Sequence, residues 1–277
     1  MNQENVMAVK SWFYDYCRLF YSPDEDFQRN IILKENHTLN VCDNTKRICR
    51  EEALDDDQVM LAEVIALLHD VGRFEQYRQY RTFKDSISVN HAELGAQILE
   101  DYEVLAAFYP HERAMIAHAV ELHNVYSVPA KIPEDIKFFL KIVRDADKLD
   151  IWRVFLEYFN QPEDVRASAA GLGLPDRPEC STEVLGRLAQ QKMVRLSSVK
   201  TLNDFKLMQL SWIYDLNFTT SFRLLFERDD INKLVATLPQ DKELADAVQV
   251  VREFAERKLL TAGSSFDLQP SGVFAGQ

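Results

Sequence analysis

The hydrophobic pattern of the chain changes abruptly at residues 69 and 70. Residues 59–68 are apolar except for Glu63, which is the pattern of a helix buried on nearly all sides. His69 and Asp70 follow at once, and an imidazole and a carboxylate in such a position are costly unless something pairs with them. The pattern leaves two interpretations open. The two residues are either a polar pair at a helix end or ligands of a metal ion, since His nitrogen and Asp oxygen both bind first-row metals.

Helical periodicity continues on both sides of this segment. His37, Val41, Asn44 and Ile48 recur at spacings of three and four, so His37 shares one face of a helix with core residues. No long alternating stretch indicates a β-sheet, and eight glycines and nine prolines are few for 277 residues. The expected fold class is therefore all-α. Further helices are predicted at about 89–99 (capped by Ser88), 110–123, 133–160, 181–195, 202–228 and 241–261.

Local signals predict where some of these helices begin and end. Ser22 followed by Pro23 is typical of a cap and a first helical position, and Asp57 is a candidate cap for the buried helix. Gly72 is placed to end that helix. Residues 73–87 are dense in Arg, Tyr and Lys without clean periodicity, so we expect an ordered loop with a short helix there.

The length of the chain allows one large domain or two small ones. We expect residues 22–160 to form the core, with residues 1–21 and 161–261 as helical extensions packed on it. The tail, residues 262–277, is expected to be mobile. Three roles stay open for the C-terminal helices: covering the site, shaping a substrate pocket or making a homodimer contact.

The net charge of −12 and the pI of about 5.0 limit the classes of partner. A nonspecific grip on nucleic-acid backbones needs a basic face, so we expect no binding to a nucleic-acid duplex. The N-terminal residues lack the pattern of a signal peptide, and the longest apolar runs are about half of what spans a bilayer. A cytoplasmic protein without a membrane partner is therefore expected. The four cysteines form no Cys-x-x-Cys pair and are expected to be reduced.

Residues with metal-binding side chains gather in one part of the chain. All six histidines lie between residues 37 and 123, and residues 144–150 add three carboxylates and a lysine in an apolar context. Together these segments resemble the HD superfamily of metal-dependent phosphohydrolases over roughly residues 30–155. The matching segments are Glu35–Val41 (ENHTLNV), Leu67–Arg73 (LLHDVGR), Asn90–Leu99 (NHAELGAQIL) and Asp145–Asp150 (DADKLD).

The resemblance implies an all-helical HD bundle, with further helices after it, that binds one or two divalent ions. Mn, Ni, Co, Fe and Mg are the candidate metals. Asp147 is favoured as the last ligand because it directly precedes a lysine, whereas Asp145 and Asp150 remain alternatives or act as caps and ion-pair partners. The implied ligands of the first ion are His37, His69, Asp70 and Asp147.

A second ion would add further histidines. His91 resembles the extra ligand of two-metal members, in which Asp70 would bridge the ions. His118 and His123 are five residues apart, about 140° around a regular helix, so both are not expected on one ion. His123, at the predicted helix end, is favoured, and His118 is kept as a weaker candidate. His111 is expected in a surface loop.

Two positively charged residues occupy positions at which members of the family carry Lys or Arg near the substrate phosphate. Arg73 follows Asp70 by three residues, and Lys148 follows Asp147 directly. With Asp70 they are the candidate catalytic residues, and both cations would also bind the phosphate. Arg78 and Tyr77 are candidates for the rim of the substrate site.

The resemblance implies hydrolysis of a small anionic phosphate ester, such as a nucleotide, by metal-activated water. Two alternatives remain. Some HD proteins use the same ligand set as di-iron oxygenases, and the scaffold also suits a noncatalytic metal or nucleotide sensor. The adjacent histidines and the Gly-Tyr-Pro segment of cyclic-dinucleotide phosphodiesterases do not occur in this sequence, which argues against cyclic dinucleotides.

Overall fold

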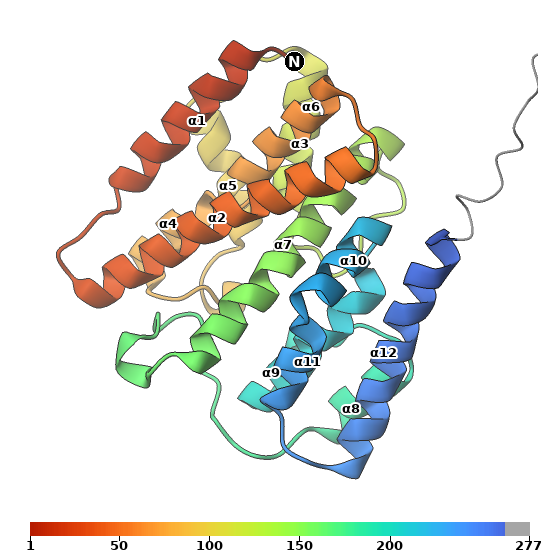
Figure 1. Ribbon diagram of the computed structural model, residues 1–277. Coiled ribbons are helices and arrows are strands. Elements are labelled where there is room, and N and C mark those ends of the chain that lie inside the picture. The colour runs from red at the N-terminus through yellow and green to blue at the C-terminus, as the bar shows by residue number, and fades with distance from the viewer. Residues whose placement is uncertain (264–277) are drawn as a thin grey trace, which may run out of the picture.

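The computed structural model describes residues 1–263, which form helices joined by turns without any β-strand (Figure 1). The all-α prediction is therefore confirmed. Short 3-10 turns lie at Asp85–Ile87, Glu163–Val165, Leu196–Ser198 and Trp212–Asp215. The helices are α1 (Gln3–Arg18), α2 (Glu25–Glu51), α3 (Asp56–Leu68), α4 (Gly72–Tyr80), α5 (His91–Asp101), α6 (Pro110–Leu122), α7 (Glu134–Asn160), α8 (Thr182–Ala189), α9 (Leu202–Ser211), α10 (Thr219–Arg228), α11 (Asp230–Ala236) and α12 (Lys242–Gly263).

The apolar helix α3 lies at the centre of the N-terminal group of helices. It packs against α1, α2, α6 and α7, and its Ile65 and Leu68 are completely buried. Each such side chain contributes roughly 1.5–3 kcal/mol relative to an exposed one. Because these helices surround α3 on several sides, they also enclose its C-terminal end, where His69 and Asp70 lie.

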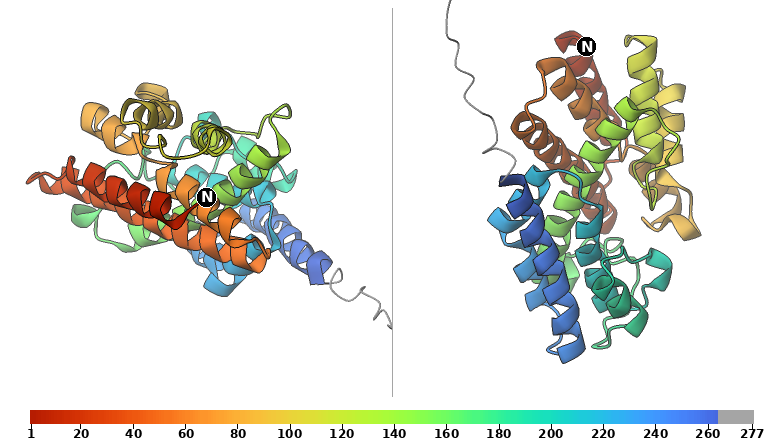
Figure 2. Two further views of the ribbon diagram at one scale, coloured as in Figure 1. Left: turned by 90° about the horizontal axis from the view of Figure 1, so that it is seen from above. Right: turned by 90° about the vertical axis from the view of Figure 1, so that its right-hand side faces the viewer.

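Helix α7 connects the two groups of helices. Its 27 residues make it about 40 Å long. It packs against α2, α3 and α6 and also against α10 and α11. Figures 1 and 2 show α1–α6 gathered at one end of the molecule and α8–α12 at the other, with α7 between them. A residue of α7 can therefore contact both groups.

Two predicted helix caps are wrong by two residues. Asp24, not Ser22, caps α2 by accepting a hydrogen bond from the backbone N–H of Phe27. Asp55, not Asp57, caps α3, where it forms a reciprocal capping box with Gln58. The run of three aspartates offers three similar caps, and the glutamine three residues after the first one selects it.

Gly72 has a different role from the predicted one. It opens α4 rather than ending α3, which stops at Leu68. A Cβ on Gly72 would lie 2.1 Å from the carbonyl oxygen of His91 and 2.7 Å from the backbone nitrogen of Gly95. Glycine is required because α4 and α5 touch through their backbones here. The ordered loop with a short helix predicted at 73–87 agrees with the structure, in which residues 73–80 belong to the short helix α4 and the 3-10 turn Asp85–Ile87 lies in the loop that follows.

Other boundaries also differ from the predictions. Asn90, not Ser88, caps α5. The predicted helix at 202–228 is broken after α9, because the Asp145 carboxylate accepts hydrogen bonds from the backbone N–H groups of Asn217 and Phe218. The predicted helix at 181–195 ends at Ala189.

At the C-terminal end, α12 runs to Gly263, so the start of the predicted mobile tail, residues 262–263, is helical. The rest of that tail, residues 264–277, lies outside the described residues. Within residues 1–263, none of the helices has the length and apolar character needed to cross a membrane. The four cysteines are free.

Candidate metal centre

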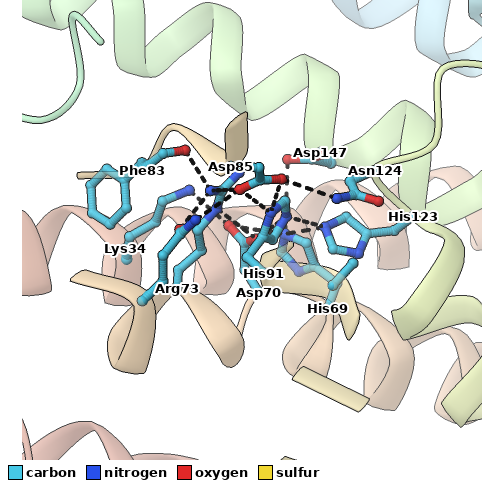
Figure 3. Close-up of polar contacts among 12 residues, drawn as sticks. Lys34, His69, Asp70, Arg73, Phe83, Asp85, His91, His123, Asn124 and Asp147 are labelled. Atoms are coloured by element: carbon cyan, nitrogen blue, oxygen red, sulfur yellow. Dashed lines mark hydrogen bonds and ion pairs between the residues drawn. The ribbon is translucent and has the colours of Figure 1, made fainter. Parts of the chain in front are cut away.

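Four side chains from three segments converge at the end of α3. His37 comes from α2, His69 and Asp70 follow α3, and Asp147 comes from α7; Figure 3 labels the last three. The Nε2 atom of His37 lies 3.1 Å from Asp147 Oδ1 and 3.6 Å from Asp70 Oδ2. The Nε2 atom of His69 lies 3.7 Å from Asp70 Oδ2 and 3.8 Å from Asp147 Oδ1.

The two histidines of this first group, His37 and His69, are fixed by their other ring nitrogens. His37 Nδ1 donates to Asp150 Oδ2 over 2.7 Å, and His69 Nδ1 donates to the carbonyl of Ala66 over 2.6 Å. Their buried Nε2 atoms have no hydrogen-bond partner. A buried polar atom without a partner costs about 1–3 kcal/mol. Both Nε2 atoms face two carboxylates, so the set fits a divalent cation.

A second group forms on the other oxygen of Asp70. Its Oδ1 lies 3.3 Å from His91 Nε2 and 3.6 Å from His123 Nε2. Again both Nδ1 atoms donate elsewhere, to Asp85 Oδ2 at 2.8 Å and to the Val120 carbonyl at 2.7 Å. Asp70 is thus shared, with one oxygen facing each histidine pair (Figure 3).

The contact between His91 and His123 also fits a cation. Their Nε2 atoms are 3.0 Å apart, and each ring already donates its Nδ1 proton. Two facing nitrogen lone pairs repel each other unless a proton or a metal ion lies between them. Burial, followed by the charge of Arg73, lowers the pKa of His91 to about 3. A proton on His91 is therefore disfavoured, and the two facing nitrogens fit joint binding of a metal ion.

The pKa values of the first group also suit a bound cation. Burial lowers the pKa of His69 to about 4, so this ligand is neutral at pH 7 as metal binding requires. Burial and Lys34 act to lower the pKa of His37, but the neighbouring carboxylates of Asp147 and Asp150 outweigh them and raise it to about 9. Burial acts to raise the pKa of Asp70, but Lys34 and His69 bring it well below its usual range.

Two cations border the carboxylate of Asp70. Lys34 Nζ lies 2.7 Å from Asp70 Oδ2, and Arg73 Nε lies 3.5 Å from Oδ1. Nη1 of Arg73 donates to the Phe83 carbonyl at 2.6 Å and to Asp85 Oδ1 at 2.9 Å (Figure 3). These bonds hold the guanidinium in place beside the shared carboxylate.

Lys148, on α7, also lines the site. Its Nζ lies 2.9 Å from Asp215 Oδ2, an acceptor that also binds Arg144 at 2.7 Å. Burial, followed by the charge of Arg144, lowers the pKa of Lys148. Lys34, Arg73, Arg144 and Lys148 all line one cavity of about 570 Å³, together with His37, Asp70, His91, His123 and Asp147. The candidate metal ligands and several cationic side chains therefore line a single chamber.

Three predicted site residues lie elsewhere. His118 is exposed on α6, where its Nδ1 donates to the Ala114 carbonyl. Arg78 is exposed and pairs with Glu75. Tyr77 is buried and stacks on Phe27, so it is unavailable to a substrate. Neither Tyr77 nor Arg78 lines the cavity, because helix α4 directs Tyr77 into the core and Arg78 to the surface. His111 is exposed in the first turn of α6 rather than in a loop.

Sequence reasoning missed Lys34 and Asp85 and left Asp150 undecided. Lys34 lies one helical turn before His37, a spacing that could have pointed to it. Asp85 lies in the turn Asp85–Ile87 and accepts hydrogen bonds from Arg73, Gln76, His91 and Asn124. No local sequence pattern points to Asp85, because only the fold of the loop brings this residue to the site.

Comparison with known proteins agrees with this geometry. No curated protein and no solved structure matches the chain. The family model of the HD domain matches residues 35–152, a range that runs from just before His37 to just after Asp150 and contains both histidine–aspartate groups. The chain therefore contains an HD domain at residues 35–152.

Proposed function

We propose that this protein is a metal-dependent phosphohydrolase that cleaves a small phosphate ester. One observation carries the proposal: the buried, unpartnered Nε2 atoms of His37 and His69 face two carboxylates, and cationic side chains line the same cavity. The donor set suits a divalent cation, and the cations beside it suit an anion. A phosphate ester would satisfy both.

The proposed roles follow from position. His37, His69, Asp70 and Asp147 would hold one ion, and Asp70, His91 and His123 a second. A divalent ion supplies a water of lowered pKa and a Lewis acid for the phosphoryl group. The chain itself would supply Arg73 to bind phosphoryl oxygens as a planar fork, and Lys148 and Lys34 as point charges. Asp85 would keep Arg73 and His91 in position through its hydrogen bonds.

A di-iron oxygenase is the second candidate, because Asp70 is shared between two histidine pairs. The cations of the cavity favour the phosphohydrolase, since dioxygen needs no anion site. Protein purified in air would be coloured and would contain about two irons per chain if the oxygenase were correct. It would also turn over no phosphate ester with any metal.

The test is a phosphoester panel with wild type loaded with Mn, Ni, Co, Fe or Mg, repeated with Arg73→Ala. We expect Arg73→Ala to retain its metal and lose about 30- to 1000-fold in rate, equivalent to about 2–4 kcal/mol of transition-state stabilisation. Arg73→Lys should recover part of the rate. Arg78→Ala is the matched control, because Arg78 lies on the same helix but not on the cavity, and its rate should stay at the wild-type level.

Failure of every ester with every metal would refute the proposed activity and favour the oxygenase or a noncatalytic sensor. Normal turnover by Arg73→Ala would remove Arg73 from the phosphate site and leave Lys148 as the first candidate. A variant that loses metal as well would mean that the residue supports the shape of the centre rather than the phosphate.

A further inference from the structure

The cavity extends well beyond the candidate metal centre, and its far wall is apolar. This wall comes from the end of α7, from the segments around residues 170 and 195 and from α9, all after the HD match at 35–152. Its main residues are Phe155, Leu172, Val194, Leu196, Met208 and Trp212. One end of the chamber thus carries charge and the other end presents hydrocarbon.

Polar side chains near the apolar wall are already engaged. Tyr126 donates its hydroxyl proton to the Met193 carbonyl and accepts from Arg187. The amide nitrogen of Asn124 donates to Asp85 and Asn90. Groups that would read the edges of a nucleobase or bind sugar hydroxyls need free donors and acceptors. The hydroxyl of Tyr126 is already engaged, and the amide nitrogen of Asn124 is engaged as well, which leaves its carbonyl oxygen as the acceptor of that side chain.

The side chain of Arg144 is likewise already hydrogen-bonded within the chain. Its guanidinium donates to the carbonyls of His123 and Val125 and to Asp215. The remaining polar residues of the lining outside the metal centre, Ser86, Arg195 and Ser197, are exposed to solvent. The inner part of the far wall therefore offers contact with hydrocarbon more than it offers hydrogen bonds.

The apolar wall is not closed off by the chain itself. Leu196 is 41% exposed, and Trp212 and Leu172 are half-buried. Phe155 and Met208 are buried as residues but still line the chamber. Apolar surface in contact with water is unfavourable, and an apolar group of a ligand would release that water. The chamber is also within the size range of small-molecule sites.

From these observations we infer that the substrate is a phosphate ester of a predominantly apolar alcohol, with its hydrocarbon part held by residues 154–212. This inference rests on the proposed function, because the cations around Asp70 fix the phosphate end. The segment beyond the HD domain then determines which ester is accepted, while the HD domain carries the metal and phosphate groups. A nucleotide, with many polar edges, fits this wall poorly.

The direct test is a series of primary alkyl phosphates with metal-loaded wild type. Ethyl, butyl and hexyl phosphate share the same type of leaving group, so differences in kcat/KM report on contacts with the chain. We expect kcat/KM to rise roughly threefold to fourfold per added methylene. Glycerol phosphate and AMP should both be poorer substrates than hexyl phosphate. A flat series, or a preference for AMP, would overturn the inference and leave the proposed function intact.

A variant pair locates the apolar contact. Leu196→Ser should lower the ratio of hexyl to ethyl phosphate kcat/KM by about fivefold, since part of the hydrocarbon wall becomes polar. Leu260→Ser is the matched control, because Leu260 is exposed on α12 and does not line the chamber. Its ratio should equal that of wild type. An unchanged ratio in Leu196→Ser would count against this placement of the alkyl chain.

A binding measurement separates this inference from the proposed activity. Ethyl- and hexylphosphonate are not hydrolysed, so calorimetry gives their Kd for metal-loaded wild type and Leu196→Ser without any turnover. We expect hexylphosphonate to bind wild type more than tenfold more tightly, and Leu196→Ser to lose most of that difference. If no ester is hydrolysed, the proposed activity fails, and this comparison still decides whether residues 154–212 hold the hydrocarbon part of an anionic ligand. Equal affinities, or no binding of either compound, would overturn it.

Discussion

His37 is held by Asp150, whose Oδ2 accepts a 2.7 Å hydrogen bond from the ring Nδ1. Asp150 is itself fixed by Arg153, which donates to both of its oxygens at 2.6 and 2.9 Å. Burial acts to raise the pKa of Asp150, but the hydrogen bonds from His37 and Arg153 lower it overall. The ionised carboxylate therefore sets the orientation of the ring and leaves Nε2 toward Asp70 and Asp147.

Asp150→Asn should weaken metal binding by about 10- to 100-fold, because an amide holds the His37 proton less strongly and the ring becomes a weaker ligand. Metal titration in a competing chelator measures the change. Asp43→Asn, at an exposed position of the same helix as His37, should bind metal as wild type does. Equal affinity in all three proteins would mean that Asp150 has no role in orienting the ligand.

The number of ions depends on the second group. Wild type should bind about two metal ions per chain and His91→Ala about one, because the facing Nε2 atoms of His91 and His123 are then lost as a pair. Calorimetric titration of metal-free protein gives the stoichiometry. A single site in wild type would contradict the assignment and would make both histidines supports for the substrate or a water.

The sequence predicted the parts of the fold that depend on strong local patterns. The apolar run before His69 identified α3 as a buried helix, and the spacing of His37 identified its inward face. The cap of α3 was misplaced because Asp55 and Asp57 are equivalent locally and only Gln58 distinguishes them. A short helix was expected within residues 73–87, but the bounds of α4 could not be predicted, because its periodicity is weak and it is positioned by a backbone contact with α5.

The candidate site was predictable to a similar extent. The histidine and aspartate motifs pointed to the residues that converge on Asp70. Asp85 could not be selected in the same way, because its contact with His91 is tertiary, whereas Lys34 could have been found from its spacing to His37 although its contact with Asp70 is also tertiary. The apolar wall around Leu196 also depends on tertiary packing, since it is assembled from segments that are separate in the sequence.

Gly72→Ala tests the contact between α4 and α5. The new methyl group would overlap the carbonyl oxygen of His91, so the helices must separate, and the free energy of unfolding should fall by about 1–3 kcal/mol or more. Urea denaturation measures this. Gly186→Ala is the control, since a Cβ on Gly186 meets nothing within 4 Å in helix α8 and should stabilise the protein by about 0.5–1 kcal/mol. Similar effects of the two variants would contradict the close contact.

We expect the stability of the folded protein to depend on pH through Asp230, a residue outside the candidate metal centre. Burial raises the pKa of Asp230 from 3.8 to about 6, although Arg228 partly offsets the effect, and its Oδ2 has no hydrogen-bond partner. Because the folded-state pKa is raised, the stability contributed by the protonated group is present below pH 3.8. That contribution is lost as pH rises through about 6.

Asp230→Asn removes this ionisation. The variant should be more stable than wild type by about 1–2 kcal/mol at pH 8, and the difference should shrink as the pH approaches 4. Denaturation at several pH values checks the trend. The exposed Asp246 on α12 supplies the control variant Asp246→Asn, which should show no such trend. A gain that is constant with pH would show that the ionisation of Asp230 is not the cause.

Metal content tests the central claim most directly. Wild type, His69→Ala, Asp70→Ala and His118→Ala would each be loaded with the same metal, dialysed and analysed for bound metal per chain. We predict that His69→Ala loses the first ion, that Asp70→Ala loses metal altogether because both groups share its carboxylate, and that His118→Ala retains the wild-type content because His118 is exposed on α6. Wild-type metal content in His69→Ala and Asp70→Ala would contradict the account.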